Sequence, residues 1–298
     1  MGFVRRRKKY ALRSQVVLFA RYKLRKIFKW PGGKSRELKR IKEYLHPDVI
    51  SGKLRLVEPF CGSAALTFSL ETKNAWLNDL DDQVMNFYRV LSTSEWENLY
   101  ENIDKVCALP FMLRDHPDRE ATHTLEDEYY AARARDFVPG LQSATDFYVR
   151  RQLCFSGMIR VSPRTGKSNV PFGWYKELKN NVSMKAHDLA KDWKLSQLSY
   201  EDMDIQPDDF VFLDPPYLGR AGYFTPDWTE DDHNHFIDWV LNLPCKWLLV
   251  HTQDSHYDKL INDPRTKKCV VGSHTYSQNF VGRKSTTNKV DHIYAFNY

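Results

Sequence analysis

Short apolar runs alternate along the chain with stretches of helical periodicity. Five runs end at polar or turn residues, as strands buried on both faces do: 54–60, 75–78, 210–213, 247–251 and 268–271. Helical patterns lie between them, at 64–71, 83–91 and 231–241. A last run, 293–298, follows a short connection, which allows it to lie antiparallel to its neighbour. This order predicts an α/β fold in which helices cover a sheet.

The middle third of the chain has a different pattern. Residues 92–185 are mainly helical with mixed charge and end in a basic, aromatic stretch that contains RTGK at 164–167, a plausible hairpin turn. Because strands flank this block on both sides, we expect an inserted domain at 92–185. The surrounding domain is then discontinuous, at 27–91 and 186–298, and residues 1–26 form a basic N-terminal arm.

Composition and charge narrow the class of protein. The 298 residues are 42% hydrophobic and 14% aromatic, enough for a sizeable core, which excludes a disordered or collagen-like chain. The net charge is only +6, but residues 1–36 hold thirteen Lys or Arg with no acid, and residues 150–185 hold eight against Glu177 alone. The rest of the chain has an acidic excess. Positive charge confined to two stretches favours a surface that binds a polyanion.

The five cysteines include no pair at CxxC spacing, which disfavours a zinc site and fits a reducing compartment. His233, His235, His251 and His256 form no convincing ligand pattern, so we expect no metal. The longest apolar run near the N-terminus, 16–20, is too short for a membrane span. These features predict a soluble cytoplasmic protein, and we interpret the basic cluster at 5–9 as a solvated arm in preference to a nuclear-import signal.

A first candidate motif, VEPFCGSA at 57–64, joins a predicted strand to a predicted helix. A small-residue turn there lets the backbone approach a ligand at the carboxyl edge of the sheet, where open α/β folds bind cofactors. Asp79 follows Gly62 by seventeen residues, at the end of the next strand, and is placed to accept hydrogen bonds from ribose hydroxyls. A structural turn and a helix cap are the simpler alternatives for these two residues.

A second motif, DPPY at 214–217, directly follows the strand at 210–213. Two prolines fix the backbone and so hold the carboxylate and the ring in fixed relative positions. Asp214 and the Pro215 carbonyl can each accept one N–H of an exocyclic amine while Tyr217 stacks on a flat base. A third motif, FKWPGGK at 28–34, supplies an aromatic face and an ammonium for a charged, nucleotide-like ligand.

Together, these motifs resemble in their order those of the DNA adenine-N6 methyltransferases of the Dam family. The stretch RRQLCFSGMIRVSPRTGKSNVPFGWY at 150–175 resembles that family's DNA-reading hairpin, and Asn279, Arg283 and KVD at 289–291 also fit the family pattern. The resemblance extends over roughly residues 27–298.

The resemblance implies a Rossmann-like S-adenosylmethionine-dependent sheet with an inserted target-recognition domain carrying a β-hairpin. It assigns catalysis to Asp214, Pro215, Pro216 and Tyr217, and cofactor contacts to Trp30, Lys34, Phe60, Gly62, Asp79 and Asp214. It assigns DNA contacts to Lys29, Phe155, Ser156, Met158, Arg160, Asn169 and Pro171, with Arg160 on a guanine. The implied substrate is double-stranded DNA, methylated on a flipped adenine within GATC or a related short site, as in restriction-modification systems.

Several positions depart from the family pattern. Ala64 stands in place of a glycine, Ser156 in place of an asparagine, and Val161 and Ser162 in place of an aromatic residue and an asparagine. These changes bear on the sequence read more than on the reaction. N4-cytosine methylation and a catalytically inactive DNA-binding module are the alternatives, and the oligomeric state is left open, with a monomer compatible.

Overall fold

The computed structural model describes residues 24, 26–162, 164–217, 228–278 and 286–298. The basic arm predicted at 1–26 therefore lies outside the described residues, except for Leu24 and Lys26, as do Asn279 and Arg283. The described strands are β1 (Arg55–Glu58), β2 (Ala75–Asn78), β3 (Lys194–Ser196), β4 (Asp209–Leu213), β5 (Lys246–Thr252), β6 (Lys268–Gln278) and β7 (Thr286–Phe296). The α-helices are α2 (Leu38–Tyr44), α3 (Pro47–Ile50), α4 (Ala65–Leu70), α5 (Asp82–Ser92), α6 (Trp96–Cys107), α7 (Leu125–Ala134), α8 (Leu141–Leu153), α9 (Met184–Ala190), α10 (Glu230–Leu241) and α11 (Asp258–Asn262). The 3-10 helices are η1 (Lys34–Arg36), η2 (Phe155–Gly157), η3 (Tyr200–Asp202) and η4 (Ser255–Tyr257).

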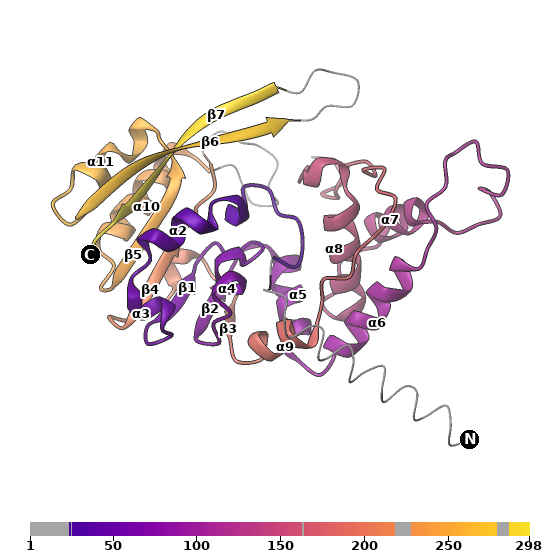
Figure 1. Ribbon diagram of the computed structural model, residues 1–298, viewed down its shortest axis with the longest axis horizontal. Coiled ribbons are helices and arrows are strands. Elements are labelled where there is room, and N and C mark those ends of the chain that lie inside the picture. The colour runs from indigo at the N-terminus through magenta and orange to yellow at the C-terminus, as the bar shows by residue number, and fades with distance from the viewer. Residues whose placement is uncertain (1–23, 25, 163, 218–227, 279–285) are drawn as a thin grey trace.

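The strands form one sheet in the order β3-β2-β1-β4-β5-β7-β6 (Figure 1). Strands β1 to β5 are parallel, and β7 is antiparallel to both β5 and β6. From β1 the chain passes outward to β2 and β3, then returns to β4 on the other side of β1. Open α/β sheets bind ligands at such a reversal, outside the carboxyl ends of the two central strands. The topology therefore marks the ends of β1 and β4 as the candidate site.

The central strands are buried on both faces. Along β4, Phe210 and Phe212 point into the core cluster that holds the buried side chains of α4 and α5. Val211 and Leu213 point the other way, into the cluster formed with α10 and α11. This is why β4 is a continuous apolar run with no alternation of polar residues. Burial of both faces makes the strand a rigid support for whatever follows it.

The middle of the chain forms a helical part beside the sheet, at the right of Figure 1. Helices α5, α6 and α7 pack against α8, and the rings of Phe87 in α5 and Phe147 in α8 are 5.9 Å apart. The core of this part is continuous with the core on one face of the sheet. After α8 the chain forms a hairpin in which Val161 pairs with Ser168, so the predicted turn is present.

Three strands differ clearly from the sequence expectation. Strand β6, expected at 268–271, extends to Gln278. Strand β3 was not expected, because it has three residues with an exposed lysine and no apolar run, and it pairs with β2 at the edge of the sheet. The last strand, β7, begins at Thr286, well before the predicted 293, because it continues into a long pairing with β6 that spans Thr286 to Phe296. Its antiparallel direction agrees with the expectation.

No helix in the described ranges is long and apolar enough to cross a bilayer. Within the same ranges, no group of three or more His, Cys, Asp or Glu side chains is arranged to hold a metal ion. Of the four histidines considered above, His233 and His251 are buried, His256 is half-buried and His235 is exposed.

Candidate active site

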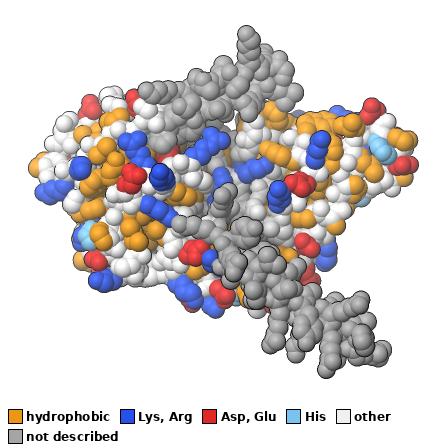
Figure 2. Space-filling view, viewed as in Figure 1, with side chains coloured by type: hydrophobic (Ala, Val, Ile, Leu, Met, Phe, Trp, Pro, Cys, Tyr) orange, Lys and Arg blue, Asp and Glu red, His pale blue; other side chains and the backbone are white. Residues whose placement is uncertain are grey.

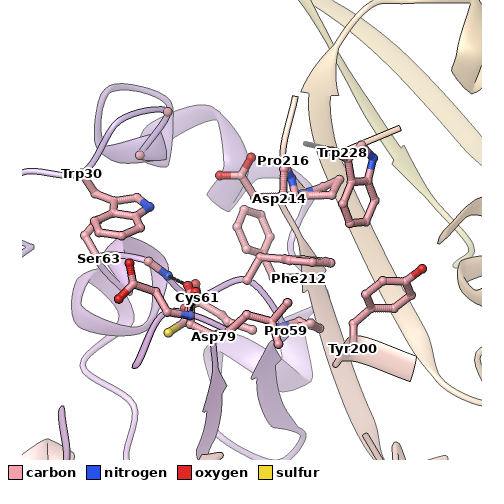
Figure 3. A pocket seen from close by; sticks show the side chains of 18 of the residues that line it. Trp30, Pro59, Cys61, Ser63, Asp79, Tyr200, Phe212, Asp214, Pro216 and Trp228 are labelled. Carbon is pink, nitrogen blue, oxygen red and sulfur yellow. Dashed lines mark hydrogen bonds between the residues drawn. The ribbon is translucent and has the colours of Figure 1, made fainter. Parts of the chain in front are cut away.

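The loops after β1 and β4 line one cavity. Residues 59–64 follow β1 and residues 214–217 follow β4, and the two strands pair directly, with Val57 opposite Val211. A cavity of about 340 Å³ lies at their carboxyl ends, lined by both loops, by Asp79 after β2 and by Trp30 (Figure 3). This volume is in the range of small-molecule sites. Three of the predicted motifs therefore meet in one place.

Gly62 is required by its surroundings. Its φ of +44° lies in the left-handed region, and a Cβ added to it would lie 2.5 Å from Nε1 of Trp30. The next loop residue but one, Ala64, is also left-handed, at φ 46°. A residue with a Cβ adopts this conformation at a cost of about 1–2 kcal/mol, which explains why glycine would suit position 64 better than the alanine present. At Gly62, the indole of Trp30 packs directly against the loop after β1.

Two carboxyl groups beside this loop have raised pKa values. Asp79 accepts a hydrogen bond from the Gly62 N–H at 2.8 Å and from the Asp81 N–H at 3.0 Å, and burial raises its pKa to about 7. Glu58, the last residue of β1, accepts a bond from the Thr67 N–H at 3.0 Å, and burial raises its pKa to about 7. Perturbed carboxyl groups gathered in a cavity are typical of functional sites.

Lys34 joins the third motif to the DPPY loop. Its ammonium, which is 3% exposed, donates to Asp214 Oδ1 and, at 3.1 Å, to the hydroxyl of Tyr217. Burial works to lower the pKa of Lys34, but the charge of Asp214 and its hydrogen bond to Lys34 act in the opposite direction, and the pKa lies above its ordinary value. Burial raises the pKa of Asp214, and the Lys34 ammonium opposes that shift. Lys34 therefore holds the acceptor and the ring in place. It also lines the cavity, and its contact with the cofactor stays a prediction.

A buried carboxylate anchors the segment that carries Lys34. Glu37, which follows η1, is 4% exposed and its Oε2 lies 2.8 Å from Nδ1 of His292 and accepts a bond from the Tyr294 hydroxyl at 3.0 Å. Both partners belong to β7. The ammonium of Lys34 is thus positioned by a strand of the sheet, although η1 itself is only three residues long.

The Tyr217 ring is supported from behind by β5. It is 8% exposed, lines the cavity and packs against the imidazole of His251, with ring centroids 4.3 Å apart and an interplanar angle of 31°. Pro215 is buried and Pro216 half-buried. The ring that the sequence suggests as a stacking surface is therefore fixed by its hydroxyl and by one of its faces.

An aromatic wall of the cavity was missed by the sequence analysis. Tyr200 and Trp228 line the cavity with Phe60, at ring-centroid distances from Phe60 of 5.6 and 6.1 Å (Figure 3). Within the described residues, Nε1 of Trp228 is buried without a hydrogen-bond partner. Tyr200 follows β3, the strand that was not expected, so its position at the sheet edge could not be inferred. Trp228 has no motif of its own.

The predicted DNA contacts lie on and around the hairpin, apart from the cavity. Arg160, Asn169, Met158 and Pro171 are exposed. The Arg160 guanidinium donates from Nε to the Asn169 side-chain oxygen at 2.6 Å and from Nη2 to the Asn169 carbonyl at 3.0 Å. Ser156 is exposed at a left-handed φ of 53°. The hairpin is connected to the cavity through Ile159, which lines it.

Two other predicted DNA contacts are partly covered. Lys29 donates to the Gln152 carbonyl at 2.5 Å, and its ammonium lies 3.5 Å from the centroid of the Tyr175 ring. Burial lowers the pKa of Lys29 to about 8. Phe155 is half-buried against the core cluster. The role of both residues on DNA stays a prediction.

The side chains around the cavity fit S-adenosylmethionine chemically. Asp79 offers a carboxylate suited to ribose hydroxyls, and the loop at 60–63 offers backbone at close approach. The wall of Phe60, Tyr200 and Trp228 suits a flat base. The carboxyl groups of Glu58 and Asp214 suit the cationic part of such a molecule.

Comparison with known proteins agrees with this chemistry. The family model of D12 class N6 adenine-specific DNA methyltransferases matches residues 30–279. Type II methyltransferase M.CviBI of Paramecium bursaria Chlorella virus NC1A is 30% identical over 201 residues, which cover 65% of this chain and 69% of the relative. Type II methyltransferase M.MjaIII of Methanocaldococcus jannaschii is 26% identical over 267 residues, 82% of this chain and 90% of the relative. DNA adenine methylase of Vibrio cholerae is 25% identical over 288 residues, 92% and 96% of the two chains. The resemblance inferred from the motifs is thereby confirmed, and the chain belongs to the D12 class of N6 adenine-specific DNA methyltransferases.

Proposed function

We propose that this enzyme transfers a methyl group from S-adenosylmethionine to N6 of an adenine swung out of duplex DNA, within GATC or a related short site. The observation that carries the proposal is the shared cavity of the DPPY loop and the glycine loop after β1. If the two loops were only structural turns, there would be no reason for the amine acceptors of one loop and the close-approach backbone of the other to line the same cavity.

S-adenosylmethionine supplies an electrophilic methyl group on a sulfonium. The residues proposed to hold it are Asp79 at the ribose, Phe60 and Trp30 as apolar faces, and the Gly62 backbone, all of which line the cavity. The Asp79 carboxylate already accepts the Gly62 N–H, so the loop and the ribose acceptor are fixed relative to each other.

Asp214 and the Pro215 carbonyl are proposed to accept the two N6 hydrogens. Of the two Asp214 oxygens, Oδ1 accepts from Lys34, and Oδ2 is the proposed acceptor for the adenine. Drawing both hydrogens toward fixed acceptors moves the nitrogen toward sp³ geometry and aims its lone pair at the methyl group. The Lys34 ammonium favours the ionised form of Asp214 against the effect of burial, and Tyr217, packed on His251, supports the base.

Residues 92–185 are proposed as the target-recognition domain. Swinging a base out of the stack costs a few kcal/mol, which contacts to the duplex must offset. Lys and Arg side chains gather across the middle of the molecule, where the sheet meets the helical part (Figure 2). Arg160 is proposed to read a guanine, with the Asn169 side chain holding its guanidinium in plane.

The test is incubation of the enzyme with labelled S-adenosylmethionine and two duplexes that differ only by GATC or GTAC, followed by nucleoside analysis. Label in N6-methyladenine from the GATC duplex alone supports the proposal. Label in N4-methylcytosine would support the cytosine alternative, and binding without label would support an inactive module. Equal label in the two duplexes would contradict the site while leaving the reaction intact.

A further inference from the structure

Arg151, in the last turn of α8, ties the base of the hairpin to the loop that carries Trp30. The residue is 6% exposed. Its guanidinium donates to three main-chain carbonyls: Nε to Lys29 at 3.1 Å, Nη1 to Met158 at 2.9 Å and Nη2 to Gly157 at 2.6 Å. Its Cζ also lies 5.5 Å from the ring centroid of Trp30.

Trp30, the ring that Arg151 contacts, lines the cavity. Trp30 covers Gly62 so closely that no Cβ fits there, and the Gly62 N–H is bonded to Asp79. A displacement of the Trp30 loop therefore changes both a wall of the cavity and the loop after β1.

The contacts of Arg151 with the Gly157 and Met158 carbonyls depend on the conformation of the hairpin base. Ser156 and Gly157 are left-handed, with φ values of 53° and 69°, and this turn aims the Gly157 and Met158 carbonyls at Arg151. Main-chain acceptors can be met by the guanidinium only while the turn keeps this shape. The three bonds use the planar fork of arginine, which a lysine ammonium cannot reproduce.

The helical part grips the same loop at a second place. Gln152 donates from Nε2 to the Ile27 carbonyl at 2.9 Å, and Asn181 donates to that carbonyl at 3.0 Å. Residues 27–29 are thus held by side chains from α8 and from the segment before α9, while Trp30 faces the cavity.

We infer that Arg151 is a positioning residue that couples occupation of the cofactor cavity to engagement of DNA by the hairpin, so that each ligand strengthens binding of the other. The inference rests on the proposed function, since it takes the cavity as the cofactor site and the hairpin as a DNA contact. Linkage requires the same factor in both directions, and couplings of this kind are commonly about 5-fold to 150-fold.

The test measures dissociation constants of a fluorescent GATC duplex with and without saturating S-adenosylhomocysteine, and of S-adenosylhomocysteine with and without the duplex. The variant is Arg151→Lys, which keeps the charge. The matched control is Arg133→Lys: Arg133 also donates to a hairpin carbonyl, that of Val170 at 2.8 Å, and lies over a ring, that of Tyr130 at 4.7 Å, but comes from α7.

The native enzyme is expected to bind the duplex at least about fivefold more tightly with S-adenosylhomocysteine present. Arg151→Lys should reduce this ratio to below about twofold, in both directions of the cycle, while Arg133→Lys preserves it. Full synergy in Arg151→Lys, or loss of synergy in both variants, would overturn the inference. A native enzyme that binds both ligands without synergy would also overturn it and leave the proposed function standing, whereas one that binds neither would contradict the proposed function.

Thermal melting checks that Arg151→Lys folds. If it does not, the same cycle on Trp30→Phe replaces it, because this variant loses part of the surface that joins the guanidinium to Gly62. Lost synergy in Trp30→Phe supports the coupling, and retained synergy contradicts it.

Discussion

The indole of Trp30 lies against Gly62 so closely that a Cβ on the glycine would be 2.5 Å from the indole Nε1. A residue from the start of the chain and a residue from the loop after β1 are thereby fixed as one surface of the cavity. This contact explains why the turn needs glycine for reasons of space as well as backbone conformation.

Gly62→Ala should therefore weaken cofactor binding strongly, by tenfold or more, because the left-handed φ costs about 1–2 kcal/mol and Trp30 must also move. Isothermal titration with S-adenosylmethionine measures the effect. Gly52→Ala is the matched control, since Gly52 has a φ of +76° with open space around it. It should lower the melting temperature slightly and leave cofactor affinity unchanged. Equal affinities for the native enzyme and Gly62→Ala would contradict the assigned role of the loop.

Lys34→Met should shift the pH dependence of methyl transfer. Ionised Asp214 is a stronger acceptor of N6–H bonds than the neutral acid, so activity should fall as the pH falls through the pKa of Asp214, which burial raises. Removing the ammonium takes away the charge that opposes this rise. The acid limb of the single-turnover rate should consequently move to higher pH, with a lower rate at neutral pH. Lys39→Met, an exposed residue of α2, serves as the control and should keep the native profile. An unmoved acid limb in Lys34→Met would refute the electrostatic role.

Cofactor affinity should fall as the pH drops below about 7, because the pKa of Asp79 is about 7 and only its ionised form accepts both ribose hydrogens. Asp79→Asn should bind about 1.5–3 kcal/mol more weakly above that pH, the usual contribution of a hydrogen bond to a charged group. Its affinity should also lose most of the pH dependence. Glu58 has a similar pKa, so Glu58→Gln separates the two carboxyl groups. If Asp79→Asn titrated like the native enzyme, another group would be responsible.

Arg160→Ala should reduce discrimination at one guanine of the site by roughly 1–3 kcal/mol. Arg164→Ala, at the exposed turn of the same hairpin, should instead weaken all duplexes alike and reduce the salt slope by about one. Competition binding against duplexes with single substitutions measures both effects. Intact discrimination at every position in Arg160→Ala would show that the hairpin does not read that base.

Much of the fold follows from local sequence. The strands at 75–78 and 210–213 are buried on both faces, and such strands produce uninterrupted apolar runs that are readable without a structure. Strand β3 is different, because three residues at a sheet edge need no apolar pattern; its pairing with β2 supplies its hydrogen bonds. The site residue that follows it, Tyr200, was missed for the same reason.

Residues that act through distant contacts could not be inferred either. Arg151 binds carbonyls of three residues on two different segments, and carbonyls carry no sequence signature. His251 supports Tyr217 from β5, a relationship set by strand order. The sequence identified Lys34 as an ammonium group of the site, but its bond to Asp214, 180 positions away, depends on the fold.

The most direct measurement is single-turnover transfer to duplex DNA by the native enzyme and Asp214→Asn, with DNA binding measured in parallel. Asparagine keeps the shape but replaces one acceptor by a donor, so the rate should fall by at least about a hundredfold, as for loss of a single stabilising group in other active sites. Duplex affinity should be retained, and Asp208→Asn, an exposed neighbour before β4, should transfer at the native rate. Native-rate formation of N6-methyladenine by Asp214→Asn would contradict the acceptor role of the DPPY loop.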